Sequence, residues 1–189
     1  MLLDGQLHYY PSLLDPQQAD ILYQQLLQEI PWQTGHVFIY GREHLIPRLQ
    51  AWHGDPGISY TYSGKTLQAD AWTPTLANLC QQLNQLLGLQ LNAVLCNLYR
   101  NGNDCMGWHA DDEKELGENP QILSISLGAE RDFALRRQGS SRQSGTLRLA
   151  NGSLLDMRPG MQNHWQHSLP KRARIQQSRI NLTFRTLYN

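Results

Sequence analysis

The chain has 189 residues, a length that suits one domain with a core of its own. Its 16 basic and 16 acidic residues give a formal net charge of zero, so any nucleic-acid-binding surface has to be a local patch. The amino terminus is too polar for a signal peptide, no apolar run reaches membrane length, and the cysteines show no metal-type pairing. We therefore expect a cytoplasmic protein with free thiols and no membrane partner.

Two helices are predicted in the first half of the chain. Asp15-Pro16 joins an N-cap residue to a proline in the first turn. Apolar residues then recur at helical spacing, at Ala19, Leu22, Leu26 and Ile30. The second helix is expected to begin at Thr73-Pro74 and to end at Gly88. Its apolar face consists of Leu76, Leu79, Leu83 and Leu87. Between the helices, residues 31–72 carry aromatics, Gly and Pro, which favours a β-rich lid with loops.

After Gly88 the pattern changes to short β-like segments. They span 91–99, 122–128, 132–137, 146–150, 153–157 and 179–187. Asn151-Gly152 predicts a two-residue hairpin between two of them. Two helices followed by a run of strands predict an α+β domain, with the helices on one face of a β-sandwich or barrel.

A candidate metal motif is His109-Ala110-Asp111. Residues two apart in an extended chain point the same way, so this imidazole and carboxylate can reach one ion. A histidine further along would complete a facial triad, the ligand set of non-haem Fe(II) oxygenases. His164 and His167 are the candidates, and their spacing does not choose between them. The alternative is an exposed turn with a local His–Asp hydrogen bond.

The last predicted strand alternates strictly between apolar and polar residues. Arg179, Asn181, Thr183 and Arg185 share its polar face, and Asn97 and Tyr99 form a similar pair on an earlier strand. One interpretation places these faces in solvent or at a sheet edge. The other places them in an anion pocket, where the two arginines grip the ends of a dicarboxylate.

Together these residues resemble the AlkB family of Fe(II)/2-oxoglutarate-dependent nucleic-acid dealkylases. The similarity runs from about residue 38 to the C-terminus, and the order and spacing of its motifs are more specific than any one of them. The matching segments are 46–48, 59–64, 97–99, 109–113, 125–128, 131–133, 152–155, 164–170 and 179–185. The resemblance implies an α+β fold with a double-stranded β-helix (jelly roll) core, N-terminal helices packed on one sheet and a β-rich substrate lid.

The resemblance also implies a role for each site residue. It places iron on His109, Asp111 and His167. It assigns 2-oxoglutarate to Asn97, Tyr99, Arg179, Asn181, Thr183 and Arg185, with the second arginine on the distal carboxylate and the first nearer the metal. It places the damaged base against Tyr60, Thr61, Tyr62, Asp112 and Glu113, with Tyr62 and the His109 ring as the walls of a slot. Residues 39–41 fall where duplex-acting members carry an aromatic finger, so Tyr40, Gly41 and Arg42 join the substrate set.

The implied activity is oxidative dealkylation of N-alkylated bases, of the 1-methyladenine and 3-methylcytosine type, with Fe(II), O2 and 2-oxoglutarate. The products are an aldehyde, succinate and CO2. We expect one domain over 1–189, with the lid at about 31–72 and the catalytic core at about 91–189. The expected partner is alkylated DNA, with RNA as an alternative, and the expected state is a monomer.

A local phosphate-binding rim is a further hypothesis, and ordinary solvated charge is its alternative. The rim would consist of Arg136, Arg137, Arg142, Lys171, Arg172 and Arg174. Two alternative functions remain at this point. One is a dioxygenase of the same chemistry that acts on RNA, protein or lipid, and the other is a non-catalytic jelly-roll module that binds nucleic acid or senses a metal.

Overall fold

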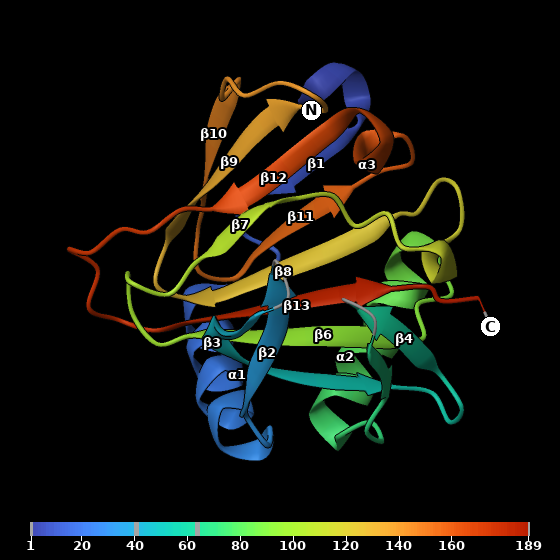
Figure 1. The fold of residues 1–189 in the computed structure, drawn as a ribbon. Helices are drawn as coiled ribbons and strands as arrows, with labels where there is room; N and C mark the ends of the chain where they lie inside the picture. The colour runs from blue at the N-terminus through green and yellow to red at the C-terminus, as the bar shows by residue number, and fades with distance from the viewer. Residues whose placement is uncertain (1, 40–41, 63–64, 189) are drawn as a thin grey trace.

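Two antiparallel β-sheets face each other in the computed structural model of the chain (Figure 1). It describes residues 2–39, 42–62 and 65–188, and only the backbone of residues 37–39, 42–43, 60–62 and 65–67. The larger sheet has seven strands, in the order β1 (Leu7–Tyr10), β11 (Ser153–Met157), β8 (Ile122–Gly128), β13 (Arg179–Arg185), β6 (Ala93–Tyr99), β3 (Arg42–Gly54) and β2 (Gln33–Ile39). The smaller sheet has four strands, in the order β10 (Gly145–Leu149), β9 (Arg131–Arg137), β12 (Trp165–Leu169) and β7 (Met106–His109).

A third, two-stranded sheet and several helices complete the fold. The small sheet pairs β4 (Ser59–Tyr62) with β5 (Lys65–Gln68). The helices are α1 (Pro16–Glu29), α2 (Pro74–Leu87) and α3 (Met161–His164), with 3-10 turns η1 (Leu3–Gly5) and η2 (Lys114–Leu116). None of the helices in the described ranges combines the length and the apolarity needed to cross a membrane.

Both predicted helices are confirmed, together with the residues predicted to cap them. The Asp15 side chain accepts a 2.8 Å hydrogen bond from the Gln18 N–H, and the Gln18 side chain accepts one from the Asp15 N–H. Thr73 caps α2 in the same way at the N–H of Leu76. Gly88 ends α2 with φ 66°, a left-handed conformation that glycine adopts without strain. Each side-chain cap contributes about 1 kcal/mol to helix stability.

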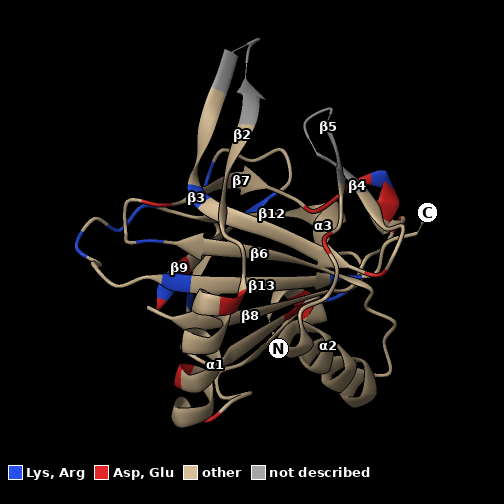
Figure 2. Cartoon of the chain, turned by 90° about the horizontal axis from the view of Figure 1, so that it is seen from below, with Lys and Arg blue, Asp and Glu red and all other residues tan. Residues whose placement is uncertain are grey.

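The core lies in two layers on either side of the seven-stranded sheet. Figure 2 shows α1 and α2 together on one side of this sheet, with β7 and β12 of the smaller sheet on the other. The helix layer packs residues such as Leu26 and Leu79 on Cys96, Ile125 and Leu182. The layer between the sheets is a separate apolar cluster that includes Phe133, Leu135, Leu155, Met157 and Trp165. The expected α+β jelly roll, with helices on one sheet, is therefore confirmed.

The two-residue hairpin predicted at Asn151-Gly152 is wrong. β10 and β11 flank this turn, but β10 pairs with β9 in the small sheet and β11 pairs with β1 and β8 in the large one. The turn is tied to β8 instead, because the Asn151 side chain accepts from the Gly128 N–H and the Gly152 N–H donates to the Ser126 carbonyl. The chain thus crosses from one sheet to the other at this corner.

The polar face of the last strand is buried and does not lie in solvent. β13 is a central strand with β8 and β6 on its two sides, and all seven of its residues are buried. Helices cover its outer face and the four-stranded sheet covers its inner face. Its arginines therefore lie inside the molecule, where an unpaired charge is costly.

The stretch 31–72 is β-rich, but it is not one separate unit. β3 pairs with β6, so β2 and β3 extend the seven-stranded sheet. Only β4 and β5 form a hairpin outside it.

Candidate metal centre

Three side chains with metal-binding atoms converge at the edge of the four-stranded sheet. His109 ends β7, and His167 lies directly opposite it on β12. Asp111 follows two residues after β7 ends, so it belongs to an irregular segment and not to the extended strand that the motif suggested. The ligand atoms of the three residues lie within 4.8 Å of one another, close enough to share one ion. His164 lies apart, exposed on α3, with its Nδ1 3.2 Å from the Gln6 amide nitrogen.

Contacts with neighbouring groups orient both histidines as potential ligands. The His109 Nδ1 lies 3.0 Å from the Gly107 carbonyl, so it donates there and leaves Nε2 for a metal. Burial, with the nearby His109 and Arg185, lowers the pKa of His167 to about 3, although Asp111 opposes the shift. The ring of Phe133 stacks on His167 at a centroid distance of 5.0 Å and holds its plane.

Asp111 is held as a carboxylate. Its Oδ1 accepts a 2.7 Å hydrogen bond from Arg185 Nη2, and its Oδ2 lies 3.8 Å from His167 Nε2. Burial alone raises the pKa of this carboxyl, but the Arg185 guanidinium, with the two neighbouring imidazoles, holds it below its ordinary value. An ionised oxygen ligand therefore faces the two imidazoles at neutral pH.

A cavity of about 40 Å³ leads from this trio into the space between the sheets. Arg179 lies along it and is only 2% exposed. Its Nη2 donates to Ser126 Oγ at 2.9 Å, and its guanidinium carbon lies 5.3 Å from the centroid of the Tyr99 ring. Among the described residues, its Nε and Nη1 have no hydrogen-bond partner. Burial lowers the pKa of Arg179 to about 10, so it is still a cation at neutral pH. Among the described residues that line this cavity, the one carboxylate is that of Asp111, and it pairs with Arg185 and not with Arg179.

Buried amides and hydroxyls form the rest of the cavity wall. The Asn181 amide donates to Ser124 Oγ at 2.7 Å, and its Oδ1 accepts from Thr183 Oγ1 at 3.2 Å. Asn97 Oδ1 accepts from Arg48 Nε at 2.7 Å and from Gln50 Nε2 at 3.1 Å. These bonds fix the side chains in one arrangement, which favours recognition of one ligand shape.

A second cavity, of about 80 Å³, adjoins the first at two of the three ligand residues. It shares His109, Asp111 and Arg185 with the first cavity, and Trp52 and Glu113 also line it. His109 and Asp111 thus line both a cavity with a buried arginine and a cavity with an aromatic ring and a carboxylate.

The profile of the family described as the 2OG-Fe(II) oxygenase superfamily matches residues 6–185. The chain belongs to this superfamily. It is 42% identical to mouse DNA oxidative demethylase ALKBH2 over 188 residues, which cover 94% of this chain and 79% of the mouse protein. The human ALKBH2 protein is 40% identical, with 94% and 72% covered. Human alkB homolog 3, described as an alpha-ketoglutarate-dependent dioxygenase, is 38% identical, with 95% and 65% covered.

Solved structures support the fold. The structure of OsALKBH1 has a TM-score of 0.64 at 18% identity and covers 98% of this chain and 100% of its own. An oxidoreductase of the 2OG-Fe(II) oxygenase family from Burkholderia pseudomallei has a TM-score of 0.59 at 13% identity, with 95% and 84% covered. The resemblance to the AlkB family is therefore confirmed.

As a 2OG-Fe(II) oxygenase, the chain uses Fe(II), 2-oxoglutarate and O2. The structure fits both bound groups. Two imidazoles and one carboxylate leave three positions open on an iron ion, as these oxygenases require. The unpartnered donors of Arg179 fit a carboxylate, since guanidinium favours paired bonds with it.

The two arginines lie in the opposite order from the one expected. The resemblance placed Arg185 on the distal carboxylate and Arg179 nearer the metal. In the structure Arg185 bonds to Asp111, whereas Arg179 lies at Tyr99 and Ser126. The cause is the register of β13: Arg185 pairs with Ala93 at one end of β6 and Arg179 with Tyr99 at the other.

The residues expected to contact the base are only partly within the described chain. Glu113 lines the second cavity, and the neighbouring Asp112 is exposed. Tyr40 and Gly41 lie outside the described residues. The side chains of Arg42, Tyr60, Thr61 and Tyr62 lie outside them as well, and so does the slot between Tyr62 and His109.

Several site residues were missed in the sequence. Ser124 and Ser126 alternate with apolar residues on β8, so the argument used for β13 would have found them. Arg48 and Gln162 show no such signal. Their contacts with Asn97 and Asp111 join segments 49 and 51 residues apart, which only the fold brings together.

Proposed function

We propose that this oxygenase removes N-alkyl groups, of the 1-methyladenine and 3-methylcytosine type, from DNA bases. The observation that carries the proposal is the trio of His109, Asp111 and His167 at a cavity that holds the buried Arg179, with a second cavity that also reaches His109 and Asp111. The names of the mouse and human relatives, DNA oxidative demethylase ALKBH2, supply the substrate class.

In this proposal Arg179 holds the distal carboxylate of 2-oxoglutarate, and the trio holds iron. Arg179 is the buried cation with unpartnered donors, and Ser126 orients it. Arg185 lies toward the metal-chelating end, with Asn97, Tyr99, Asn181 and Thr183 along the wall. Binding of the dicarboxylate would neutralise a buried charge whose isolation costs several kcal/mol.

Iron held by His109, Asp111 and His167 would supply, with 2-oxoglutarate and O2, the oxidising power for removal of the alkyl group. The products would be the unmodified base, an aldehyde, succinate and CO2. The residues of the chain orient the reacting groups and exclude water from them. Asp111 and His167 are 4% and 5% exposed, so bulk water has little access to the reacting centre. Arg185 keeps the Asp111 carboxylate ionised and in one orientation.

The base would enter the second cavity. A base has to leave the stack before its alkyl group can reach the metal, and a flat ring and a carboxylate are suitable partners for a cationic alkylated base. Trp52 and Glu113 provide both. We assign the other substrate contacts to Asp112 and to Tyr40, Gly41, Arg42, Tyr60, Thr61 and Tyr62. We also propose a single domain over 1–189, with the lid at about 31–72 and the core at about 91–189.

The charge distribution supports a polyanionic partner. Residues 129–174 carry nine of the sixteen basic residues but only three of the sixteen acidic ones. This region is therefore basic, although the formal net charge of the chain is zero. Figure 2 shows this charge along β9 and in loops on the same side of the molecule. Phosphate groups of DNA would bind such a region by releasing their counterions.

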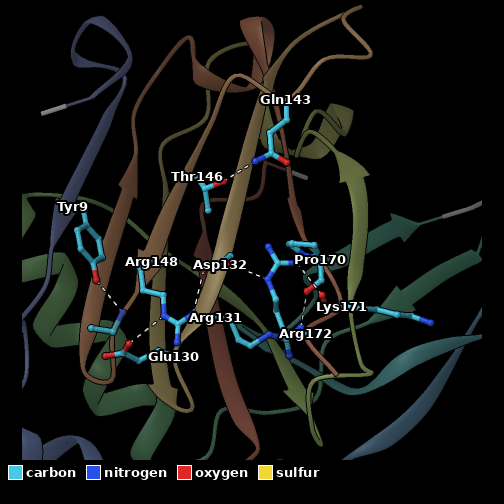
Figure 3. Close-up of polar contacts among 11 residues, drawn as sticks. Tyr9, Glu130, Arg131, Asp132, Gln143, Thr146, Arg148, Pro170, Lys171 and Arg172 are labelled. Atoms are coloured by element: carbon cyan, nitrogen blue, oxygen red, sulfur yellow. Dashed lines mark hydrogen bonds and ion pairs between the residues drawn. The ribbon is translucent and has the colours of Figure 1, made fainter. Parts of the chain in front are cut away.

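Not every cation of the expected rim is available for phosphate. Figure 3 shows Asp132 between Arg148 and Arg172, and its carboxylate pairs with Arg172 at 2.6 Å. Arg136 stacks on the Trp108 ring at 4.5 Å, and Arg137 stacks on the Trp165 ring at 4.2 Å. The exposed Arg142, Lys171 and Arg174 form no ion pair with any acid in the described ranges, and we assign the rim to these three.

The test is mass spectrometry of oligonucleotides that carry 1-methyladenine or 3-methylcytosine, incubated with Fe(II), ascorbate and 2-oxoglutarate. We expect loss of the methyl group in DNA, with formaldehyde and succinate formed in equal amounts, and no reaction with Asp111→Ala. Single-stranded DNA, duplex DNA and RNA form parallel arms. Succinate formation without loss of the methyl group from any arm would point to a protein or lipid substrate. No 2-oxoglutarate turnover at all would point to a binding module.

The monomeric state and the cytoplasmic location stay predictions. Sedimentation analysis and fractionation of cells would test them separately from the chemistry.

A further inference from the structure

Gln162 is a buried polar side chain that the proposed mechanism does not use. It lies on α3, five residues before His167, and is 2% exposed. Its Oε1 accepts a 3.0 Å hydrogen bond from the backbone N–H of Asp111, and its Nε2 lies 3.6 Å from the Met157 sulfur. Since an N–H requires an acceptor, the amide oxygen must face Asp111, and the amide NH2 is left with a sulfur that accepts weakly.

The backbone of Asp111 needs this bond because no strand supports it. β7 ends at His109, and residues 110–113 have no regular structure. In an antiparallel strand a neighbouring carbonyl would accept the Asp111 N–H, whereas here the side chain of Gln162 does. A buried N–H without a partner costs about 1–3 kcal/mol, so loss of this acceptor would favour another path for the chain at Asp111.

α3 is itself held firmly, so it can act as a support. The Gln138 N–H donates to the His164 carbonyl at 2.8 Å, and the Met161 N–H donates to the Arg158 carbonyl at 3.1 Å. Arg185 holds the carboxylate of Asp111 and Gln162 holds its main chain. The position of Asp111 is thereby tied to the same short segment that leads into His167.

We infer that Gln162 is a positioning residue that fixes the Asp111 main chain, and with it the distance between Asp111 and His167, for metal binding. The inference rests on the ligand set of the proposed function. Residues that orient metal ligands contribute about 10–100-fold to metal affinity in other sites, although they touch no metal.

The test compares Gln162→Met, which keeps the length of the side chain but removes the acceptor, with Asn163→Ala. The control alters the neighbouring residue of α3, whose contacts are with residues 118 and 119. Calorimetric titration of each metal-free protein with Mn(II), without 2-oxoglutarate, measures the ligand set alone. We expect about tenfold or greater loss of Mn(II) affinity in Gln162→Met and less than about twofold in Asn163→Ala.

The outcomes separate the inference from the proposed function. Unchanged Mn(II) affinity in a folded Gln162→Met protein overturns the inference and leaves the proposed function intact. Failure of the unaltered protein to bind Mn(II) overturns both. Equal losses in both variants would assign the effect to α3 as a whole and not to Gln162.

A second measurement does not depend on the folding of a variant. Amide hydrogen exchange of the unaltered protein by NMR reports on the Asp111 N–H directly. We expect protection similar to that of β7 amides, and exchange as fast as that of an exposed loop would contradict the inference.

Discussion

Arg185, the last residue of β13, donates a 2.7 Å hydrogen bond from Nη2 to Oδ1 of Asp111, and the two side chains are 3% and 5% exposed. The pair joins a central strand of the large sheet to the irregular segment that follows β7. It gives Arg185 a role at the metal end of the cavity, distinct from that of Arg179. The predictions for the two arginines therefore differ.

Arg185→Ala should weaken both folding and metal binding. Removal of one partner from a buried pair leaves an uncompensated charge and costs about 3–5 kcal/mol. Urea unfolding of the metal-free protein measures this loss, and Mn(II) titration should show weaker affinity because Asp111 is no longer oriented. Full Mn(II) affinity in the folded variant would mean that the pair is only structural.

Arg179→Ala should weaken 2-oxoglutarate binding while leaving Mn(II) affinity nearly unchanged. The lost carboxylate contact should cost on the order of 2–5 kcal/mol, which is about 30-fold or more in affinity. Titration of the Mn(II)-loaded protein with 2-oxoglutarate measures it. Arg148→Ala is the matched control, since this exposed arginine pairs with Glu130 and Asp132 and does not line the cavity. Unaltered 2-oxoglutarate affinity in Arg179→Ala would mean that 2-oxoglutarate does not bind in this cavity.

The metal-free protein should lose stability as pH falls below about 6.5, because of His167. Burial lowers the pKa of this histidine to about 3 in the folded state, whereas its pKa in the unfolded chain is about 6.5. Between these values the unfolded state binds a proton that the folded state does not, so stability falls with pH by up to about 1.4 kcal/mol per unit. Urea unfolding between about pH 7 and pH 5 measures the slope.

The matched variants for this pH dependence are His167→Gln and His164→Gln. The slope of the free energy of unfolding against pH should become shallower in His167→Gln, by the contribution of one titrating group. It should stay unchanged in His164→Gln. A slope that is unaffected by His167→Gln would show that other groups cause the pH dependence.

Gly152→Ala should destabilise the corner between the two sheets. Gly152 has φ 76°, and a Cβ there would lie 2.8 Å from the Leu14 carbonyl oxygen and 3.1 Å from Ala19 Cβ. Left-handed strain costs about 1–2 kcal/mol for an L-residue, and the close contact adds to it. Gly145→Ala is the control, because a Cβ at that position meets nothing within 4 Å and the backbone has no positive φ. Equal stability of the two variants in urea would contradict this account.

The combined variant Arg142→Ala/Lys171→Ala/Arg174→Ala should bind DNA more weakly and with less dependence on salt. Each lost phosphate contact should reduce the salt slope by about 0.9 for duplex DNA. Fluorescence anisotropy at several salt concentrations gives the slope. Lys114→Ala, on the η2 turn, is a control with the same loss of charge per residue. A slope that does not change would place the DNA on another surface.

Local features of the sequence determined the elements and the kinds of side chain at the site. Asp15-Pro16, Thr73-Pro74 and Gly88 set the ends of α1 and α2, because caps act within a few residues of chain. Strict alternation identified the polar face of β13, and the motif order supplied His109, Asp111 and His167. Each of these signals is carried by neighbouring residues.

Contacts between distant segments were decided only by the tertiary structure. Asn151-Gly152 can form a tight turn, but which strands pair beside it depends on the competing partners β9, β1 and β8. The roles of Arg179 and Arg185 depend on the register of β13 against β6, and the roles of Gln162 and Arg48 depend on hydrogen bonds across about 50 residues. Such pairings arise because buried polar groups need hydrogen-bond partners, and the packed sheets decide which groups lie close together. The spacing of residues along the chain does not predict these partners.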